Sequence, residues 1–546
     1  MRSSATARLT ALAVLAALCA APALAQSPLV IEPGINSIPN AINGDTNPPD
    51  DRVYVLRRGQ RYLYTEQLIT ERPVTIVAEE GDGPRPIIQA NFDPNAGEGN
   101  RPFRPLADFT IRGVYIYGLD TAGRFTDNAM IRAAGDNVRV VVDDVHLDGN
   151  RGGGVRFDND GGVLIMTNSV LSNTVRPPNR GSTQAIRITP VEMDSLVVRN
   201  STIYNTSDFV FFNQGVIDYV ELSHVTVYGN GREFPFRTPI DVEQVGEFVF
   251  ADNILYNYEL AGTPQGFLEN EEGEPIPNFI GFAVSADSVA TDTLGGRRAP
   301  DLTLRNGNIF QDQEIYDALP DTVVASPGFF NETIQAAFDG GLAGEDSFFG
   351  EDLDFVRPPD NQAYIDRFAF YYENLTYEGA RPYPFDPREE SPAVPPDPLL
   401  PVDFAYSSSA RSYTAGTGGC PLGDLNWFRD DADVDVEACL AASFRATPTD
   451  DGPGGAATFG IRVVPNPATS AVSLLVDLDA AAAVTVTVYD MLGREVAHRE
   501  AALTAGAGQR VALDVAGVPS GAYVVRVQAE TGGAVRQATQ RLTVVR

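Results

Sequence analysis

The sequence predicts an all-β protein, with a right-handed parallel β-helix solenoid followed by a small C-terminal β-sandwich. Two observations support this fold class. A short strand preceded by Asn, Asp or Gly recurs through the body of the chain, which carries few helix signals. From Ile461 to Arg546, short Val-rich alternating strands are separated by Gly, Pro and Asp turns, which is typical of a small β-sandwich.

The N-terminus has the features of a secretory signal peptide. Arg2 and Arg8 precede an apolar run from Leu9 to Ala21, and the small residues Ala23 and Ala25 follow ahead of Gln26. We therefore expect residues 1–25 to be removed. No later stretch reaches the roughly 18 continuous apolar residues of a membrane-spanning helix, so we expect no membrane-spanning segment in the mature protein.

The body from residue 26 to 400 is expected to be the solenoid, with an N-terminal cap over residues 26–75. Successive repeat centres lie 24 to 32 residues apart until the last gap of 54, which we interpret as two coils with an insertion. Such a unit cannot bury its apolar face alone and must stack on its neighbours. A β-propeller blade needs about 40 residues, so the β-helix is favoured. The centres are Ile116, Leu147, Leu171, Ile203, Val227, Leu255 and Ile309.

An asparagine often follows the repeated strand, at Asn173, Asn205, Asn230 and Asn257. Asparagine tolerates a left-handed backbone and bonds its own main chain in tight turns. We therefore predict that these residues turn the chain at one corner of the solenoid and stack as a ladder.

Residues 401–460 are expected to form a tail and linker. Two cysteines remain after signal removal, Cys420 and Cys439, and an oxidising compartment favours a disulfide between them over two free thiols. The acidic run from Asp430 to Glu437 could bind Ca²⁺ or be a solvated linker. The sequence therefore leaves the cofactor and any metal ligands unassigned.

The charge balance excludes some classes of partner. The chain has 40 basic residues, all arginine, against 73 acidic residues, and residues 26–460 alone carry 30 arginines and 66 acids. A body with a formal charge of −36 repels nucleic acid and anionic lipid, so we expect neither as a partner. We expect a monomer with a hydrated acidic surface.

A second strand follows each repeated strand, and these strands carry the candidate site. Period two predicts outward side chains for Arg156, Arg187, Phe211 and Arg237 on four consecutive coils, about 4.8 Å apart. This arrangement suits a groove for an extracellular acidic polysaccharide, with guanidinium groups holding carboxylates or sulfates. Alternatively, the arginines pair with neighbouring acids. We also expect Asp158 and Asn213, on the same strands, to contact the substrate.

The last 86 residues or so resemble a known family of sorting domains. Three motifs occur in the family's order: Val463 to Pro467, Val484 to Val496, and Val518 to Val527. They resemble the type A C-terminal sorting domain of the bacterial type IX secretion system. The resemblance implies recognition by that secretion machinery, export across the outer membrane, removal of this domain, and delivery to the outer cell surface or the medium.

The segments Tyr413 to Gly419 and Pro421 to Phe428 resemble the closing segment of β-helix proteins in the pectate-lyase-like superfamily. That resemblance implies polysaccharide lyase activity, with Arg187 as the candidate base and Arg156 and Arg237 binding charge. The chain has no lysine, so the Lys–Arg version of that chemistry is excluded. An inverting hydrolase would need an acidic pair, for which the candidates are Asp143 with Asp144, and Asp158 with Asp160.

The sequence is compatible with three functions. We favour a secreted or surface protein that binds polysaccharide without catalysis. The first alternative is a polysaccharide lyase, and the second is a purely structural or adhesive protein. Whether the chain is an enzyme stays open at this point.

Overall fold

The computed structural model describes the following residues: 27–49, 51–91, 101–126, 128–174, 184–206, 209–213, 215–230, 236–237, 245–257, 263–264, 301–317, 323–324, 338–374, 394–395, 400–443, 460–464, 471–478, 481–490, 495–504, 506–515, 517–519, 521–531 and 534–544. The predicted signal peptide lies outside these residues. The chain divides into two compact units, of which one, residues 24–443, holds the solenoid, and the other holds the C-terminal sheets.

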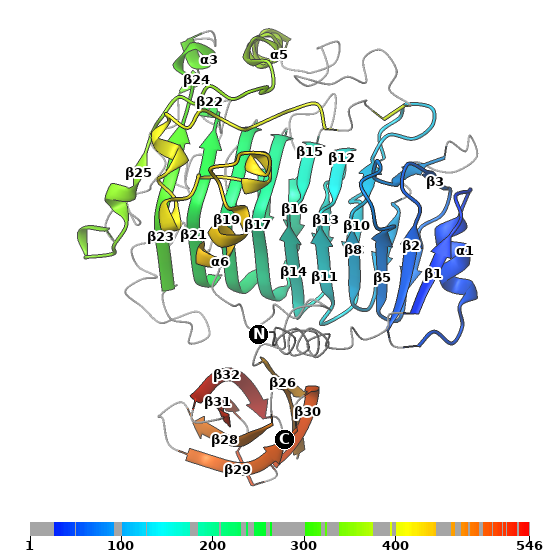
Figure 1. Cartoon of the computed structure of the whole chain (residues 1–546), viewed down its shortest axis with the longest axis vertical. Coiled ribbons are helices and arrows are strands. Elements are labelled where there is room, and N and C mark those ends of the chain that lie inside the picture. The colour runs from blue at the N-terminus through cyan, green and yellow to red at the C-terminus, as the bar shows by residue number, and fades with distance from the viewer. Residues whose placement is uncertain are drawn as a thin grey trace, which may run out of the picture. The chain divides into compact units, whose positions relative to one another are not determined.

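The solenoid is a parallel β-helix with three faces, and each coil adds one strand to each face (Figure 1). The first face contains β1 (Ser27–Ile31), β2 (Arg52–Leu56), β5 (Val74–Ala78), β8 (Phe109–Arg112), β11 (Arg139–Asp143) and β14 (Gly162–Thr167). The second face contains β3 (Arg61–Tyr64), β6 (Ile87–Ala90), β9 (Tyr115–Tyr117), β12 (His146–Asn150), β15 (Val170–Thr174) and β25 (Phe348–Phe349). The third face contains β4 (Leu68–Thr70), β7 (Phe103–Pro105), β10 (Ile131–Ala133), β13 (Val155–Phe157), β16 (Gln184–Ile188), β18 (Phe209–Asn213) and β20 (Phe236–Arg237).

Toward the C-terminal end of the solenoid, single long strands run through the corner between the first and second faces. These are β17 (Glu192–Thr206), β19 (Val216–Asn230), β21 (Val245–Tyr256) and β23 (Asp301–Phe310). They pair in parallel from β17 to β23, so that the first and second faces form one 16-stranded sheet. Two short strands, β22 (Thr263–Pro264) and β24 (Val323–Val324), pair separately.

The predicted repeat centres stack in register, which confirms the β-helix. Ile116 pairs with Leu147, and the row continues coil by coil to Leu255. These apolar side chains face inward, where parallel stacking gives each coil the partners that it lacks alone. One detail of the prediction is wrong: Leu255 pairs directly with Ile309, so the gap of 54 residues contains one coil step and not two.

Left-handed residues turn the chain at both corners of the second face. The corner before this face places one residue with positive φ in each coil, among them Asn168 at 51° and Asn200 at 46°. The corner after it uses Asn173, Asn205 and Asn257, as predicted, whereas Gly229 and not Asn230 takes the left-handed position. Asparagine side chains bridge successive coils, with Asn205 Nδ2 donating to Asn173 Oδ1 at 3.0 Å.

Further segments cover the ends and one face. Helix α1 (Ser37–Gly44) packs against β1 and β3 at the N-terminal end, where it buries Ile38 and Ile42. The yellow segment in Figure 1, which contains η3 (Arg411–Tyr413), η4 (Thr417–Gly419), η5 (Leu425–Phe428) and α6 (Val436–Ser443), lies across the last long strands. The remaining helices of the described residues are α3 (Gln313–Asp317), η1 (Glu345–Ser347) and α5 (Asn361–Asn374).

This tail segment is held by an aromatic cluster and by a disulfide. Phe404 and Tyr406 pack on Tyr228 and its neighbours on the outer side of the second face. Cys420 and Cys439 form a disulfide with their Cα atoms 5.8 Å apart. The tail is therefore part of the solenoid's own packing.

The C-terminal unit consists of two antiparallel sheets around an apolar core of Val, Leu, Ala and Tyr side chains. The smaller sheet contains β26 (Gly460–Val464), β27 (Ala471–Leu478) and β30 (Gly506–Asp514), and the larger contains β28 (Ala482–Asp490), β29 (Glu495–Leu503), β31 (Gly521–Thr531) and β32 (Ala534–Val544). Across the described ranges of the whole chain, no helix is both long enough and apolar enough to span a membrane.

Candidate functional site

The third face of the solenoid carries a row of arginines in register. Arg132 of β10 pairs with Arg156 of β13, which pairs with Arg187 of β16. Phe103 pairs with Ile131 one position earlier, which places Arg104 of β7 beside Arg132. We call Arg104, Arg132, Arg156 and Arg187 the arginine strip. With strands about 4.8 Å apart, it spans about 14 Å along the solenoid.

The strip faces outward because its neighbours in each strand face inward. Phe103, Ile131, Val155 and Ile186 are at most 2 % exposed and belong to the core. Successive side chains of a strand point to opposite sides of the sheet, so the arginine that follows each of them points out. The guanidinium groups remain partly accessible, with 28 % exposure for the side chain of Arg132 and 29 % for that of Arg156.

Apolar side chains continue the row at both ends. Ile69 of β4 pairs with Arg104 and is 40 % exposed. At the other end, Phe212 of β18 pairs with Arg187, and the guanidinium carbon of Arg187 lies 5.6 Å from the centre of its ring. Phe212 pairs in turn with Arg237, whose side chain lies outside the described residues.

Two predicted site residues are corrected by the structure. Phe211 was expected to face outward, but it pairs with Ile186, is fully buried, and belongs to the core. Asn213 was expected to contact substrate, but it is 1 % exposed. Its side chain accepts from the backbone N–H of Gly215 at 2.9 Å and donates to the carbonyl of the same residue, so it closes a turn. The pairing of β18 with β16 sets the inward orientation of both Phe211 and Asn213.

Two members of the strip, Arg104 and Arg132, were not among the predicted site residues. Both follow the pattern that identified Arg156, in which one arginine stands between two apolar residues, as in Phe103–Arg104–Pro105 and Ile131–Arg132–Ala133. The signal was therefore present in the sequence.

One carboxylate lies within the strip. Asp158 accepts from Arg156 Nε at 2.5 Å through Oδ1, and from Arg132 Nε through Oδ2. Its side chain is 13 % exposed. Asp158, a candidate substrate-binding residue, thus bridges two of the four guanidinium groups of the strip.

The surroundings of the strip are strongly positive. Burial, followed by the charges of Arg132, Arg104 and Arg156, lowers the pKa of Arg101 to about 10. Burial also lowers the pKa of Arg187, with Arg156 as the next cause. Arg101 Nη1 and Arg104 Nε are buried donors without a hydrogen-bond partner among the described residues. Crowded guanidinium groups with unmet donors favour the binding of an anion.

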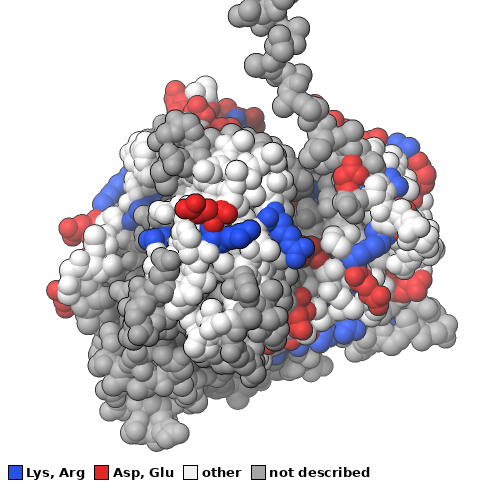
Figure 2. Space-filling view, turned by 90° about the horizontal axis from the view of Figure 1, so that it is seen from below, with Lys and Arg blue, Asp and Glu red and all other residues white. Residues whose placement is uncertain are grey.

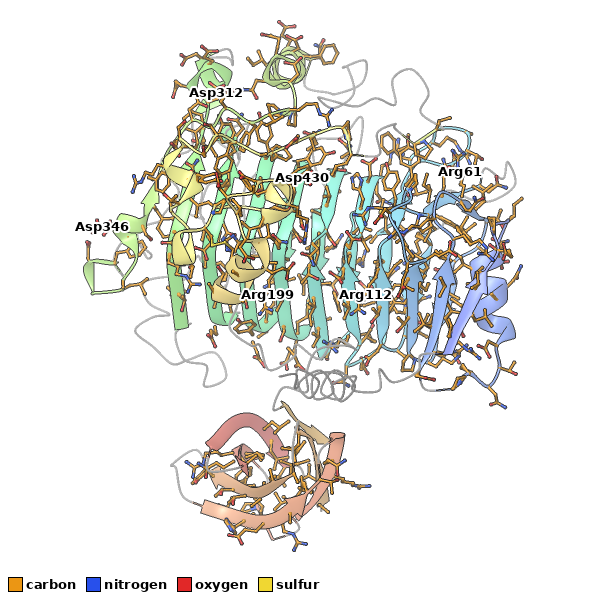
Figure 3. All side chains as sticks on the ribbon, in the orientation of Figure 1. Arg61, Arg112, Arg199, Asp312, Asp346 and Asp430 are labelled. Carbon is orange, nitrogen blue, oxygen red and sulfur yellow. A yellow bond between two sulfur atoms is a disulfide. The ribbon has the colours of Figure 1, made fainter. Side chains whose placement is uncertain are left out.

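Two arginines of the first face, Arg112 and Arg199, each lie beside one acid. Figure 3 labels Arg112 on β8 and Arg199 on β17. Arg199 binds Glu221 through two hydrogen bonds of 2.8 and 2.9 Å, and both side chains are 3 % exposed. Arg112 lies 3.5 Å from a carboxylate oxygen of Asp143. These pairs have an evident structural role, which distinguishes them from the strip.

The other acidic pairs considered for hydrolysis are also engaged in the fold. Asp143 accepts from Thr167 Oγ1 at 2.8 Å, and Asp144 accepts from Arg85 at 2.6 Å. Asp160 accepts from the backbone N–H of Glu192 at 2.8 Å. No group of three or more His, Cys, Asp and Glu within the described ranges could hold a metal ion.

A cavity of about 400 Å³ lies beside the second face, where Tyr228, Tyr256 and Asn361 meet three aspartates. The aspartates are Asp312, which Figure 3 labels, Asp352 and Asp354. Tyr228 donates to Asn361 Oδ1 at 2.8 Å, and Tyr256 donates to Asp352. The three aspartates give this cavity an acidic rim, which disfavours the binding of anions there. In the view of Figure 2, basic and acidic side chains lie interspersed, despite the formal net charge of −33.

Comparison with known proteins identifies the C-terminal unit. Residues 462–540 match the family model of a secretion system C-terminal sorting domain. No curated protein matches the chain. The sorting domain directs type IX export to the cell surface or the extracellular space, and the protein is therefore a secreted or surface β-helix protein that interacts with that secretion machinery.

Proposed function

We propose that the solenoid binds an acidic extracellular polysaccharide along the arginine strip. The observation that carries this proposal is the register of Arg104, Arg132, Arg156 and Arg187 on four consecutive coils. Asp158 bridges Arg132 and Arg156, and the side chains of both arginines remain partly exposed. Guanidinium groups bind carboxylates and sulfates with planar, charge-assisted hydrogen bonds.

The ends of the row suit a sugar polymer more than a small anion. Ile69 is 40 % exposed before Arg104, and the Phe212 ring follows Arg187. Sugars combine polar edges with apolar faces, and an aromatic ring that carries a guanidinium group offers both kinds of contact. An open row along the solenoid axis also accommodates a polymer that extends beyond the site.

Binding is tested with residues 26–546, the chain without its expected signal peptide, by isothermal titration with pectic, alginate and glycosaminoglycan polymers. We expect affinity to fall as salt rises, because the contacts are electrostatic. The double variant Arg104→Gln/Arg187→Gln should weaken binding by about tenfold or more, since each lost charge-assisted bond contributes about 1.5–3 kcal/mol.

The matched control is Arg61→Gln. Arg61, which Figure 3 labels, is an exposed arginine of β3 on the second face, whereas the strip lies on the third face. This variant removes one positive charge from the solenoid, as each of the single variants Arg104→Gln and Arg187→Gln does, so its affinity should equal that of the wild type while each single strip variant binds more weakly. Equal loss in Arg61→Gln and in the single strip variants would show that only net charge matters, and absence of binding to every polymer would refute the proposal.

A second candidate function is polysaccharide lyase activity with Arg187 as the base. The observation that favours it is the lowered pKa of Arg187, caused first by burial and then by Arg156. A base must accept the proton at C5 of a uronide while a nearby cation stabilises the carboxylate. Arg156 is adjacent in register and would supply that cation.

Lyase activity is measured by the absorbance of unsaturated uronide products with the same polymers. We expect product formation to be abolished in Arg187→Ala if this residue is the base. Product from Arg187→Ala at the wild-type rate would exclude that role. Binding without product from the wild type would leave the polysaccharide-binding function alone.

A further inference from the structure

Asp158 joins two neighbouring arginines of the strip through a single type of atom. Its Oδ1 accepts from Arg156 Nε at 2.5 Å, and its Oδ2 accepts from Arg132 Nε on the preceding coil. The side chain of Asp158 is 13 % exposed, against 28 % for Arg132 and 29 % for Arg156. The carboxylate is therefore more covered than the two guanidinium groups that it joins.

This bridge leaves one particular edge of each guanidinium group for a ligand. A guanidinium group offers its N–H donors along two edges, one that contains Nε and a terminal edge formed by Nη1 and Nη2. Within the described part of the chain, the hydrogen bonds of Arg132 and Arg156 are made by Nε alone. The terminal edges of both groups can therefore bind an anion without breaking the bridge to Asp158.

The bridge also restricts how the two arginines can move. A long side chain that is free in solution loses rotamer freedom when it binds, and the affinity is lowered by that entropy cost. Arg132 and Arg156 are direct neighbours in register, about 4.8 Å apart. One carboxylate thus holds two adjacent arginines in a fixed orientation before any ligand arrives.

We propose, on the basis of the function proposed above, that Asp158 is a positioning residue for polysaccharide binding. It fixes Arg132 and Arg156 so that their terminal edges bind the acidic groups of the polymer. The ligand groups are carboxylates or sulfates, because these anions present two oxygens that match a guanidinium edge with two parallel hydrogen bonds. Asp158 acts through the two arginines and does not itself contact the polymer.

The sign of one mutational effect separates positioning from simple charge neutralisation. Asp158→Asn removes a negative charge beside two arginines, which by itself strengthens the attraction for an anion. The asparagine side chain keeps only one acceptor oxygen and gains a donor nitrogen, so it cannot hold both Nε–H groups. Positioning therefore predicts weaker binding in this variant, and neutralisation alone predicts tighter binding.

The binding test uses residues 26–546 with polygalacturonate, alginate and heparin at one ionic strength. For each polymer that binds the wild type, we expect Asp158→Asn to raise the dissociation constant by about tenfold, because two arginines must then be ordered by the ligand. Unchanged or tighter binding by this variant would overturn the inference and leave the proposed function intact. Circular dichroism and a thermal melt check that the variant is folded.

The matched control is Asp160→Asn. Asp160 is exposed, and within the described residues it accepts from the backbone N–H of Glu192. The control variant removes the same charge two positions further along the chain and leaves the bridge to Arg132 and Arg156 in place. Its dissociation constants should equal those of the wild type or lie slightly below them. A tenfold rise in this variant as well would contradict a specific role for Asp158.

Lysine variants test the geometry at constant charge. Arg132→Lys and Arg156→Lys keep the positive charge, but an ammonium group has no planar fork that could bind Asp158 and present a second edge. We expect each to weaken binding by about fivefold or more, whereas Arg61→Lys on the second face should bind like the wild type. In the Asp158→Asn background the two substitutions should cost less, because the arginines are no longer positioned. The same cost in both backgrounds would overturn the inference.

A final readout needs no polymer. In protein with isotope-labelled arginine, we expect the Nε–H signals of Arg132 and Arg156 to exchange slowly with water, because each N–H is held in a charge-assisted hydrogen bond. The lysine variants assign the two signals. Both should exchange faster in Asp158→Asn and stay protected in Asp160→Asn. Signals that do not respond to Asp158→Asn would overturn the inference, whereas protected signals without binding to any polymer would refute the proposed function.

Discussion

The guanidinium carbon of Arg187 lies 5.6 Å from the centre of the Phe212 ring, and the two residues are direct neighbours in adjacent parallel strands. The residue before Phe212 points the opposite way, because Phe211 pairs with Ile186 in the core. The side chains of these two consecutive phenylalanines therefore lie on opposite sides of the sheet. One continues the outer row of the arginine strip, and the other fills the interior of the solenoid.

This relationship predicts opposite effects for two alanine variants. Phe211→Ala should lower the free energy of unfolding by about 3–5 kcal/mol, because it leaves a cavity in the core. Phe212→Ala should change stability far less, yet weaken polysaccharide binding several-fold because the apolar platform is lost. Urea denaturation and isothermal titration measure the two quantities. Equal destabilisation by both variants would contradict the orientation described here.

The buried ion pair of Arg199 and Glu221 predicts a large loss of stability when one partner is removed. Both side chains are 3 % exposed, and Tyr219 also donates to Glu221 at 2.6 Å. Glu221→Gln leaves Arg199 charged and buried, so we expect a loss of about 3–5 kcal/mol in urea denaturation. The control is Glu32→Gln, because Glu32 is 68 % exposed in its pair with Arg57 and should give no measurable change.

Asp424 predicts that docking of the tail depends on pH. Burial raises the pKa of this carboxyl to about 7, and its oxygens accept from Thr202 Oγ1 at 2.8 Å and from the backbone N–H of Asn426 at 2.9 Å. An unfolded aspartate titrates near about 3.9. The folded tail therefore binds the proton more tightly, and its stabilisation is complete below about pH 4 and lost as pH rises through about 7.

The measurement uses the fluorescence of Trp427, the only tryptophan of the chain, whose indole N–H donates to Thr202 Oγ1 at 2.9 Å. In the wild type, we expect the urea midpoint of this signal to fall between pH 5 and pH 9. Asp424→Asn has no carboxyl to ionise at this position. The urea midpoint of the variant minus that of the wild type should therefore increase as pH rises. A difference that is constant with pH would show that Asp424 does not titrate there.

The disulfide between Cys420 and Cys439 predicts a stability difference between oxidised and reduced protein. The bond closes a loop across a sequence separation of 19 residues, within the tail that covers the last long strands. Cross-links of this length contribute about 3 kcal/mol, mainly through the unfolded state. Cys420→Ser/Cys439→Ser should therefore lower the midpoint of the Trp427 signal. The C-terminal sheets contain neither cysteine, and their unfolding should not change.

Sequence alone was sufficient for several features because each depends on local spacing. The repeat of 24 to 32 residues predicted the stacked coils, since a unit of that size must bury its apolar face against a neighbour. Asparagine after the repeated strand predicted the left-handed corner at Asn173, Asn205 and Asn257. The C-terminal motifs predicted the sorting domain that residues 462–540 match.

Other features depended on contacts between coils, and only the tertiary structure decided them. Alternation within a strand leaves its phase ambiguous, and a shift of one residue exchanges the inner and outer faces, as happened at Phe211. Pairing with Ile186 fixed that phase and placed Phe212 outside. The bridge from Arg132 to Asp158 joins residues 26 positions apart, so no local pattern could indicate it. The sequence thus determined the repeat, while the register between coils determined which side chains form the site.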